Sequence, residues 1–380
     1  MKVSSLACLL LLASSTAFAA PVPEPPPVDA KSYALVDFAS GTLLAGREPD
    51  AQVEPASITK VMTVYIAFDY AKQGRIKLTD EALISEKAWR RGLGTNESRM
   101  FLDVGSRVKV EDLLRGVIIQ SGNDASLALA EFLAGSEDVF AQVMNQYAEK
   151  LGMKNTHFMD ASGMPDPKHY TSARDLTTLA RALIRDFPDG YKIFSEREFT
   201  YNKIKQGNRN ILLDMDPAVD GVKTGHTDGA GFCLLSSAQR DGRRLVAAVM
   251  GTKSIKYRAQ ASLELLNYGF RFFDTVSLLG TDKSVGTVRV WKGAEDEVTV
   301  GVPKPMLFTV PHGDAGKLVI TPKLDEQTMA PVEAGTKLGT VSVTLEGKEL
   351  AKVDAVALKA VAEGTLTKRL IDTVRLWIGK

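Results

Sequence analysis

A hydroxyl and an amine stand three residues apart at the start of an apolar stretch. Ser57 and Lys60 lie in Pro55-Ala56-Ser57-Ile58-Thr59-Lys60, and the residues that follow, 61–68, are nearly all apolar or small. This run predicts a helix that is buried on most sides. The i, i+3 spacing places Ser57 and Lys60 on one face of its first turn. A buried neutral lysine can take the serine proton, so the pair predicts a serine nucleophile with a lysine base.

The same two residues also fit a purely structural interpretation. Ser57 would cap the helix, and Lys60 would extend its amine into water. The pattern Ser-x-x-Lys is short enough to arise by chance in a chain of 380 residues. Taken alone, it therefore does not establish a catalytic site.

Two further short motifs follow in the chain and change this balance. They are Ser121-Gly122-Asn123 and Lys223-Thr224-Gly225. Each would be weak alone, because serine, lysine and glycine are common residues. Their order and spacing make the set specific, and each falls at the boundary of a predicted element.

The predicted elements bring the three motifs to places where side chains from different segments can meet. Ser57 lies where the buried helix begins, and Lys223 lies near the end of an alternating strand. The second motif lies in a break, Gln120–Asp124, within the mainly helical stretch 110–133. The Asn and Asp residues of this break are expected to cap the helix that restarts at Ala125.

Strand signals at both ends of a helical middle predict one antiparallel sheet. The predicted strands are 33–37, 42–45, 218–224, 231–238 and 245–251, and the further helices are 139–151, 173–186 and 257–268. Strands from both ends can pair in one sheet that helices cover. We therefore predict an α/β (α+β) domain over residues 31–276.

The residue pattern changes near Val276 to short runs of alternating apolar and polar residues, with Gly, Pro or Asp between them. The runs are 285–291, 298–302, 306–310, 318–321, 340–345 and 352–358. They predict a second, all-β domain over residues 277–362, a small sandwich. No catalytic constellation is visible in it.

Both ends of the chain carry segments that are not part of these domains. Lys2, the apolar run Leu6–Leu12 and Ala17-Phe18-Ala19 predict a secretory signal peptide over residues 1–20. A proline-rich spacer, 21–30, is expected to be extended and mobile.

The last segment, 363–380, predicts a basic amphipathic helix that lies in a membrane interface without crossing it. Its apolar face comprises Leu366, Leu370, Ile371, Val374, Trp377 and Ile378. Its basic residues, Lys368, Arg369, Arg375 and Lys380, lie off this face. The alternative is a helix that docks on the β domain.

Composition excludes several classes of function. The formal net charge is +1, so no overall field attracts the chain to nucleic acid. After signal cleavage Cys233 is the single cysteine, which excludes an internal disulfide and indicates a small buried hydrophobe. The four histidines show no metal-binding spacing. We expect no metal and no cofactor.

The three motifs together resemble those of the penicillin-recognising serine acyltransferases, the fold shared by penicillin-binding proteins and serine β-lactamases. The chain looks most like the low-molecular-mass D-alanyl-D-alanine carboxypeptidases. These have a signal peptide, a transpeptidase-like domain, a β-rich second domain and a C-terminal amphipathic anchor. The resemblance covers essentially the whole mature chain, including Arg99-Met100-Phe101, Asn208-Arg209-Asn210 and Gly269-Phe270-Arg271-Phe272-Phe273.

This resemblance implies catalytic roles for the first two motifs. Ser57 would attack the peptide carbonyl between two D-alanines and form an acyl-enzyme. Lys60 would be its base, which requires its pKa to fall by about three units, a cost of about 4–5 kcal/mol. Burial and a second cation at Lys223 are the expected causes. Ser121 would relay a proton to the leaving nitrogen, and Asn123 would hold the substrate amide or orient Lys60.

The resemblance also implies binding roles around the third motif. The oxyanion hole would use the backbone N–H groups of Ser57 and His226. Thr224 and a guanidinium, first Arg209 and then Arg258, would bind the terminal carboxylate of the substrate. Surface solvation is the alternative for both arginines. Gly225 would leave room for the substrate strand to pair with the sheet edge.

The resulting prediction is an exported serine-type D-Ala-D-Ala carboxypeptidase. It would remove the terminal D-alanine from peptidoglycan stem pentapeptides, and penicillin and other β-lactams would inhibit it covalently. It would lie on the outer, periplasmic face of the cytoplasmic membrane, peripherally anchored to the anionic surface through residues 366–380. The role of the β domain and the oligomeric state are left open.

Three alternatives remain. A peptidoglycan DD-endopeptidase would share the motifs, and an inert peptidoglycan-binding scaffold is the alternative from a different class. A class A β-lactamase needs a Glu-x-x-x-Asn loop soon after the second motif. The one match, Glu198…Asn202, lies far downstream, and the loop Asp160–Tyr170 has no glutamate and no obvious base for the deacylating water.

Overall fold

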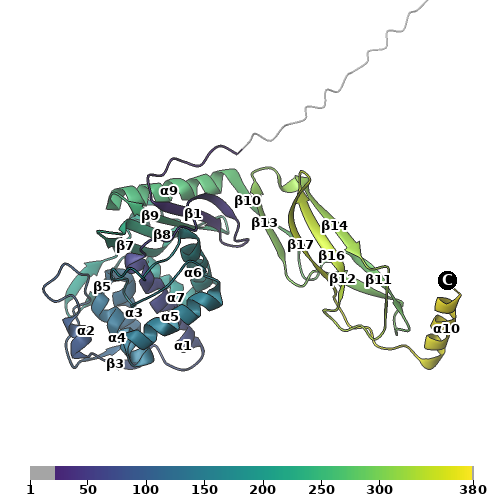
Figure 1. The fold of residues 1–380 in the computed structure, drawn as a ribbon, viewed down its shortest axis with the longest axis horizontal. Coiled ribbons are helices and arrows are strands. Elements are labelled where there is room, and N and C mark those ends of the chain that lie inside the picture. Colours follow the sequence, from purple (N-terminus) through teal and green to yellow (C-terminus); the bar gives the residue numbers. More distant parts are fainter. Residues whose placement is uncertain (1–21, 379–380) are drawn as a thin grey trace, which may run out of the picture.

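The computed structural model describes residues 22–378 as a mixed α/β unit, an all-β unit and a terminal helix (Figure 1). The predicted signal peptide, residues 1–20, lies outside the described residues. The two units follow one another along the long axis of the molecule, and the terminal helix lies at the far end of the all-β unit from the α/β unit.

A five-stranded antiparallel sheet forms the centre of the α/β unit, in the order β2-β1-β9-β8-β7. Its strands are β1 (Ser32–Asp37), β2 (Leu43–Arg47), β7 (Val219–Thr227), β8 (Gly231–Arg240) and β9 (Arg243–Thr252). Because β1 pairs with β9, strands from both ends of the unit meet in one sheet, as predicted. β7 is at the edge of this sheet.

Helices cover both faces of the sheet and give two hydrophobic cores. On one face lies α9 (Ile255–Phe272), whose Leu265 and Leu266 are fully buried. The other face carries α1 (Lys60–Lys72), α3 (Val110–Arg115), α4 (Asn123–Ala134), α5 (Glu137–Leu151) and α6 (Ala173–Asp186). α1 is apolar on nearly all sides and is buried along most of its length, as its sequence predicts.

Two predicted helix starts differ from the structure. Ser57 lies in a 3-10 turn, Ala56–Thr59, and α1 begins only at Lys60. The second helix restarts at Asn123 rather than Ala125, after a π-helical turn, Gly116–Gln120. Its N-cap is Gly122, which has no side chain. The carboxylate of Asp124 instead accepts the backbone N–H groups of residues 100–102.

Short elements complete the α/β unit. The helices are α2 (Glu86–Arg90), α7 (Pro188–Tyr191) and α8 (Leu212–Met215). The strands form two antiparallel pairs, β3 (Glu81–Leu83) with β4 (Arg107–Lys109), and the hairpin of β5 (Glu198–Tyr201) with β6 (Ile204–Gly207).

The all-β unit contains two sheets around one core. A two-stranded sheet pairs β10 (Phe273–Leu279) with β13 (Met306–Pro311). The larger sheet has the order β14 (Leu318–Leu324), β16 (Lys337–Leu345), β17 (Lys348–Ala357), β12 (Glu297–Gly301), β11 (Gly286–Trp291) and β15 (Gln327–Met329). Since β10 begins directly after α9, the all-β unit starts at Phe273, four residues before the predicted boundary.

The spacer before β1, expected to be extended and mobile, packs on the α/β unit from Val22 onward. Val28 is buried, and Val22 packs against the core beneath α9. Tyr268 on α9 donates its hydroxyl to the carbonyl of Pro23 at 2.9 Å. Residues 22–30 therefore form an extended strap on the α/β unit.

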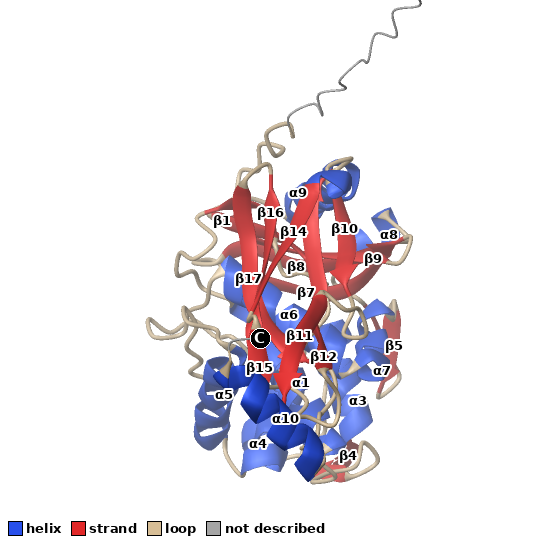
Figure 2. Cartoon of the chain, turned by 90° about the vertical axis from the view of Figure 1, so that its right-hand side faces the viewer, coloured by secondary structure: helices blue, strands red, loops and turns tan. Residues whose placement is uncertain are grey.

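The terminal helix α10 (Leu366–Trp377) lies at the end of the all-β unit, beyond β11 and β15 (Figure 2). It contacts this unit through its polar side. Asp372 is only 2% exposed and accepts the backbone N–H of Lys292 at 2.8 Å. The apolar side faces away, with Leu370 68% and Trp377 87% exposed. Within residues 22–378 no helix is long and apolar enough to cross a membrane.

Candidate active site

The three motifs come together around one cleft of about 1020 Å³. Among the predicted site residues, the lining includes Ser57, Ser121, Asn123, Arg209, Thr224, Gly225, His226 and Arg258. The two lysines, Lys60 and Lys223, lie buried behind this surface. Residues from a 3-10 turn, a loop between helices and an edge strand thus face one space.

Lys60 is fully buried, and its amine makes three polar contacts. Nζ lies 2.8 Å from Ser57 Oγ, 2.7 Å from Asn123 Oδ1 and 2.8 Å from the carbonyl oxygen of Ser162. The amide and carbonyl oxygens can only accept hydrogen bonds, whereas the serine hydroxyl can donate or accept. A neutral amine has two N–H groups for those acceptors, which leaves its lone pair for the Ser57 hydroxyl.

The pKa of Lys60 is lowered from the usual range to about 7, and burial is the main cause. Asp160 and Glu97 oppose this shift, and two cations, Arg91 and Arg209, reinforce it. A substantial fraction of Lys60 is therefore neutral at physiological pH, as a general base for Ser57 must be.

Lys223 lies on β7 and meets Ser121 across the cleft wall. Its Nζ donates to Ser121 Oγ at 2.9 Å and to the carbonyl of Thr224 at 3.2 Å. Burial, followed by repulsion from Lys60, lowers the pKa of Lys223 well below its usual range. Ser121 has a φ of 61°, a left-handed conformation that is uncommon for a residue with a side chain. Such strain is concentrated at functional sites.

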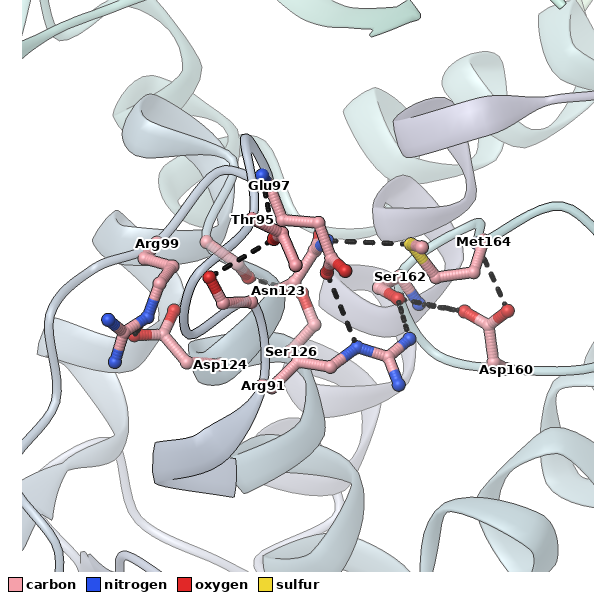
Figure 3. A network of polar contacts seen from close by, with 12 residues as sticks. Arg91, Thr95, Glu97, Arg99, Asn123, Asp124, Ser126, Asp160, Ser162 and Met164 are labelled. Atoms are coloured by element: carbon pink, nitrogen blue, oxygen red, sulfur yellow. Dashed lines mark hydrogen bonds and ion pairs between the residues drawn. The ribbon is translucent and has the colours of Figure 1, made fainter. Parts of the chain in front are cut away.

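Asn123 occupies the first position of α4, where its side chain is free to reach across the site. Its Oδ1 accepts from Lys60, and its Nδ2 donates to Glu97 Oε2 at 2.7 Å (Figure 3). Of the two roles expected for Asn123, this geometry favours the orientation of Lys60. Glu97 is a cleft residue that the motifs did not indicate.

The loop after α5 forms a second wall, built around Asp160. This carboxylate accepts the backbone N–H groups of Ser162, Gly163 and Met164 at 2.6, 2.7 and 3.1 Å. Burial alone would raise its pKa, but His169 and the backbone N–H groups of Ser162 and Gly163 hold it below the usual range. The turn Asp160-Ala161-Ser162-Gly163 contains residues typical of side-chain-stabilised turns, a signal from which this wall could have been found.

The third motif lies on the edge strand β7 against the turn that carries Ser57. A Cβ at Gly225 would lie 2.8 Å from the carbonyl oxygen of Pro55. Close packing of β7 on the Ser57 turn is therefore one reason for this glycine, beside the expected space for the substrate strand. His226 is exposed, and its ring packs over Phe232 with centroids 4.0 Å apart.

The two arginines predicted for carboxylate binding differ in their surroundings. Arg209 is exposed in the cleft, and its Nε donates to the carbonyl of Gln120 at 3.0 Å. Arg258 is buried, which contradicts the surface alternative for this residue. Its Nη1 donates to the carbonyls of Gly225 and Cys233, at 3.0 and 3.3 Å, and so links β7 to β8.

Residues considered for other chemistry lie elsewhere. Glu198 forms an ion pair with Lys205 in the β5–β6 pair, and neither Glu198 nor Asn202 lines the cleft. Cys233 is buried, and burial raises the pKa of its thiol to about 11. The part of the chain that the structure describes contains no group of three His, Cys, Asp or Glu residues placed to hold a metal ion.

Comparison with known proteins identifies the family. Residues 19–254 match the family model described as D-alanyl-D-alanine carboxypeptidase. Residues 273–363 match that of the penicillin-binding protein 5 C-terminal domain. The chain belongs to the D-alanyl-D-alanine carboxypeptidase family. The family match confirms the predicted serine peptidase and its β-rich second domain.

Individual relatives support this assignment over nearly the whole chain. The D-alanyl-D-alanine carboxypeptidase DacA of Escherichia coli (strain K12) is 42% identical over 366 residues, which cover 94% of this chain and 91% of that protein. The crystal structure of penicillin binding protein 5 from Haemophilus influenzae matches with a TM-score of 0.85 at 41% identity. The match covers 90% of the present chain and 100% of the chain in the Haemophilus influenzae structure. The carboxypeptidase is thus a serine peptidase that acts on D-alanyl-D-alanine peptides.

Proposed function

We propose that the cleft carries out D-Ala-D-Ala hydrolysis with Ser57 as nucleophile and Lys60 as its general base. The observation that carries this proposal is the set of contacts at the Lys60 amine. Two pure acceptors, Asn123 Oδ1 and the carbonyl of Ser162, fix its N–H groups and leave the lone pair for Ser57 Oγ at 2.8 Å.

In the acylation step, Ser57 Oγ forms a bond to the carbonyl carbon between the two D-alanines as its proton passes to Lys60 Nζ. The carbonyl oxygen gains negative charge, which the backbone N–H groups of Ser57 and His226 would stabilise. As the C–N bond breaks, the leaving nitrogen needs a proton. Ser121, which accepts from Lys223 at 2.9 Å, would relay it.

Terminal D-alanine leaves with its carboxylate, and water then hydrolyses the ester on Ser57. Arg209 and Thr224 would bind that carboxylate before cleavage, since both line the cleft. Arg258 has a supporting role in this arrangement, because its Nη1 is already bound to two strand carbonyls. β7 is an edge strand, so its free side offers backbone groups to an extended peptide.

A D-alanine release assay on a stem pentapeptide, run beside intact-mass measurement with penicillin, tests the proposal. Release of D-alanine together with a long-lived covalent adduct is the expected result. The absence of an adduct would indicate an inert scaffold. A short-lived adduct would indicate a β-lactamase. Cleavage of cross-linked peptides without release of D-alanine from the pentapeptide would indicate an endopeptidase.

Arg209→Ala should reduce kcat/KM on a D-Ala-D-Ala peptide by roughly 10- to 150-fold, because a charge-assisted hydrogen bond is worth about 1.5–3 kcal/mol. Steady-state kinetics on a peptide with a free or an amidated C-terminus measures this loss. The fall should be much smaller on the amidated peptide, in which the charge pairing is already absent.

Arg209→Lys is the matched variant, and it should recover only part of the loss because lysine lacks the two-pronged planar donor. The Nε contact to Gln120 also holds the guanidinium in place, which lysine cannot reproduce. An equal loss on both peptides would assign Arg209 to the shape of the cleft rather than to the carboxylate.

We also propose that the mature protein is exported and is held at the outer face of the cytoplasmic membrane by α10. The polar side of this helix is occupied by the all-β unit, through Asp372 and through the ion pair of Lys368 with Asp296. The side turned outward is apolar and carries Leu370 and Trp377. A docked helix with its apolar side exposed can enter a lipid interface without unfolding.

Truncation after Gly364 should release the protein from anionic vesicles at low salt while leaving penicillin binding intact. Flotation of the protein with vesicles measures the bound fraction. Leu370→Glu should weaken binding in the full chain, because it places a charge in the apolar face. Leu83→Glu, a change at an exposed leucine on β3 in the other unit, is the matched control and should float as wild type does. A truncated protein that still floats would place the anchor elsewhere.

A further inference from the structure

The two residues whose oxygens accept from the Lys60 amine, Asn123 and Ser162, each contact one member of a pair of opposite charges. Figure 3 shows Arg91 and Glu97 side by side between Asn123 and Ser162. Arg91 follows α2, and Glu97 lies in the loop that leads to the Arg99-Met100-Phe101 segment. Neither residue belongs to the three motifs, and both side chains are about three-quarters buried, with exposures of 24% and 23%.

Glu97 determines which way the Asn123 amide points. Its Oε2 accepts from Asn123 Nδ2 at 2.7 Å, so the amide oxygen is turned toward Lys60. Without this carboxylate, Met164 Sδ, 3.6 Å away, is the remaining protein partner of Nδ2 in the described chain. A sulfur is a weak acceptor and would not prevent the amide from rotating. A rotated amide would present N–H groups to the amine and remove one of its acceptors.

Arg91 makes the corresponding contact on the other wall. Its Nη2 donates to Ser162 Oγ at 3.3 Å, and the carbonyl of Ser162 is the other acceptor of Lys60. Arg91 Nε lies 3.6 Å from Glu97 Oε2 and has no hydrogen-bond acceptor among the described residues. Glu97 is therefore an ion-pair partner of this guanidinium, and the pair joins the two walls of the site.

We propose that Arg91 and Glu97 are a pair of positioning residues that align the two acceptors of Lys60 and set the charge around its amine. The proposal rests on the role of Lys60 as the base. Glu97 acts through Asn123, and Arg91 acts through Ser162. Neither side chain touches Lys60 itself, so each is a positioning residue and not a catalytic one.

The two charges act on Lys60 in opposite directions. Glu97 raises the pKa of Lys60, and Arg91 lowers it. The other charged groups around Lys60 are Asp160, Arg209 and Lys223, and Glu137 lies near Arg91. Replacing Arg91 or Glu97 leaves these other charged groups in place. Each single variant therefore changes the charge near Lys60 at one position only.

The test is the pH profile of penicillin acylation by the purified full-length mature protein. Loss of a negative charge in Glu97→Gln disfavours the protonated lysine, so the acidic limb should move to lower pH. Loss of a positive charge in Arg91→Gln favours the protonated lysine, so the limb should move to higher pH. For charges at this range each shift should be roughly half a pH unit or more. Arg91→Lys, which keeps the charge, should restore most of the wild-type midpoint.

The alignment of Asn123 is tested at high pH, where Lys60 is neutral in every variant. Glu97→Gln keeps an oxygen that can accept from Asn123 and should acylate at close to the wild-type plateau rate. Glu97→Ala removes that acceptor and should lower the plateau by about tenfold to a hundredfold. Thermal melting of each variant separates this loss from a loss of folded protein.

The exposed ion pair of Arg90 with Glu86 on α2 provides the control, one residue away from Arg91. Glu86→Gln and Arg90→Gln should leave the midpoint unchanged. Midpoints of Glu97→Gln and Arg91→Gln that equal the wild type, or that move in the same direction, would overturn the proposal. If Lys60→Arg is inactive in that case, only the pair is refuted; an active Lys60→Arg would refute the base and the pair together.

Discussion

Replacing Ser57 with alanine should abolish the penicillin adduct completely. The strained lactam would present its carbonyl carbon where the substrate amide lies, and Ser57 Oγ is the hydroxyl whose proton Lys60 can accept at 2.8 Å. Alanine has no oxygen with which to form the ester. Intact-mass spectrometry after incubation with penicillin measures the adduct, and D-alanine release should fall to background in the same variant.

A second cleft serine provides the control for this experiment. Ser98→Ala alters a side chain that lines the cleft and for which no chemical role is assigned, so its adduct should form as in wild type. Peptide mapping of the wild-type adduct should place the added mass on Ser57. Labelling of Ser57→Ala at any other residue would overturn the assignment.

The motif residues were predictable because their geometry is largely set by regular structure. Ser57 and Lys60 are three residues apart at a helix start, which places them on one face and allows Oγ and Nζ to meet. Lys223 reaches the site because β7 is the strand at the sheet edge. The antiparallel sheet was likewise predictable from the strand periodicity at both ends of the unit.

Residues whose contacts depend on loop conformation could not be predicted in this way. Glu97 meets Asn123 from 26 positions away, and Asp160 organises a turn that packs on the Ser57 segment. A Cβ at Gly163 would lie 1.8 Å from the carbonyl oxygen of Ala56, which shows how closely these segments approach. No periodicity encodes such an approach, because it depends on where two irregular segments end up in space.

The terminal helix shows a different limit of sequence reasoning. Its amphipathic pattern fits either a membrane interface or docking on the all-β unit. In the structure the helix does dock, but through Asp372 and the polar side. Charge–charge and hydrogen-bond partners on the all-β unit decided the orientation, and these partners are far from α10 in the sequence.

Lys60→Arg should reduce the rate of penicillin acylation by roughly 10²–10⁴-fold, the usual contribution of a general base. Arginine keeps the positive charge and can reach the same acceptors, but it is not deprotonated in proteins and so cannot take the Ser57 proton. Stopped-flow or quenched mass measurement of the acylation rate, together with a thermal melt, distinguishes lost chemistry from lost structure. Near-normal acylation by this variant would exclude Lys60 as the base.

The pH dependence of the wild-type protein gives an independent check on the same residue. Burial lowers the pKa of Lys60 to about 7, and the base works only when neutral. The acylation rate should therefore rise through a midpoint near pH 7 and level off above it, since the neutral fraction grows as pH increases. Any residual rate in Lys60→Arg should lack this limb. A limb that persists unchanged in Lys60→Arg would assign the titration to another group. Lys223 is the nearest candidate, because burial and repulsion from Lys60 also lower its pKa.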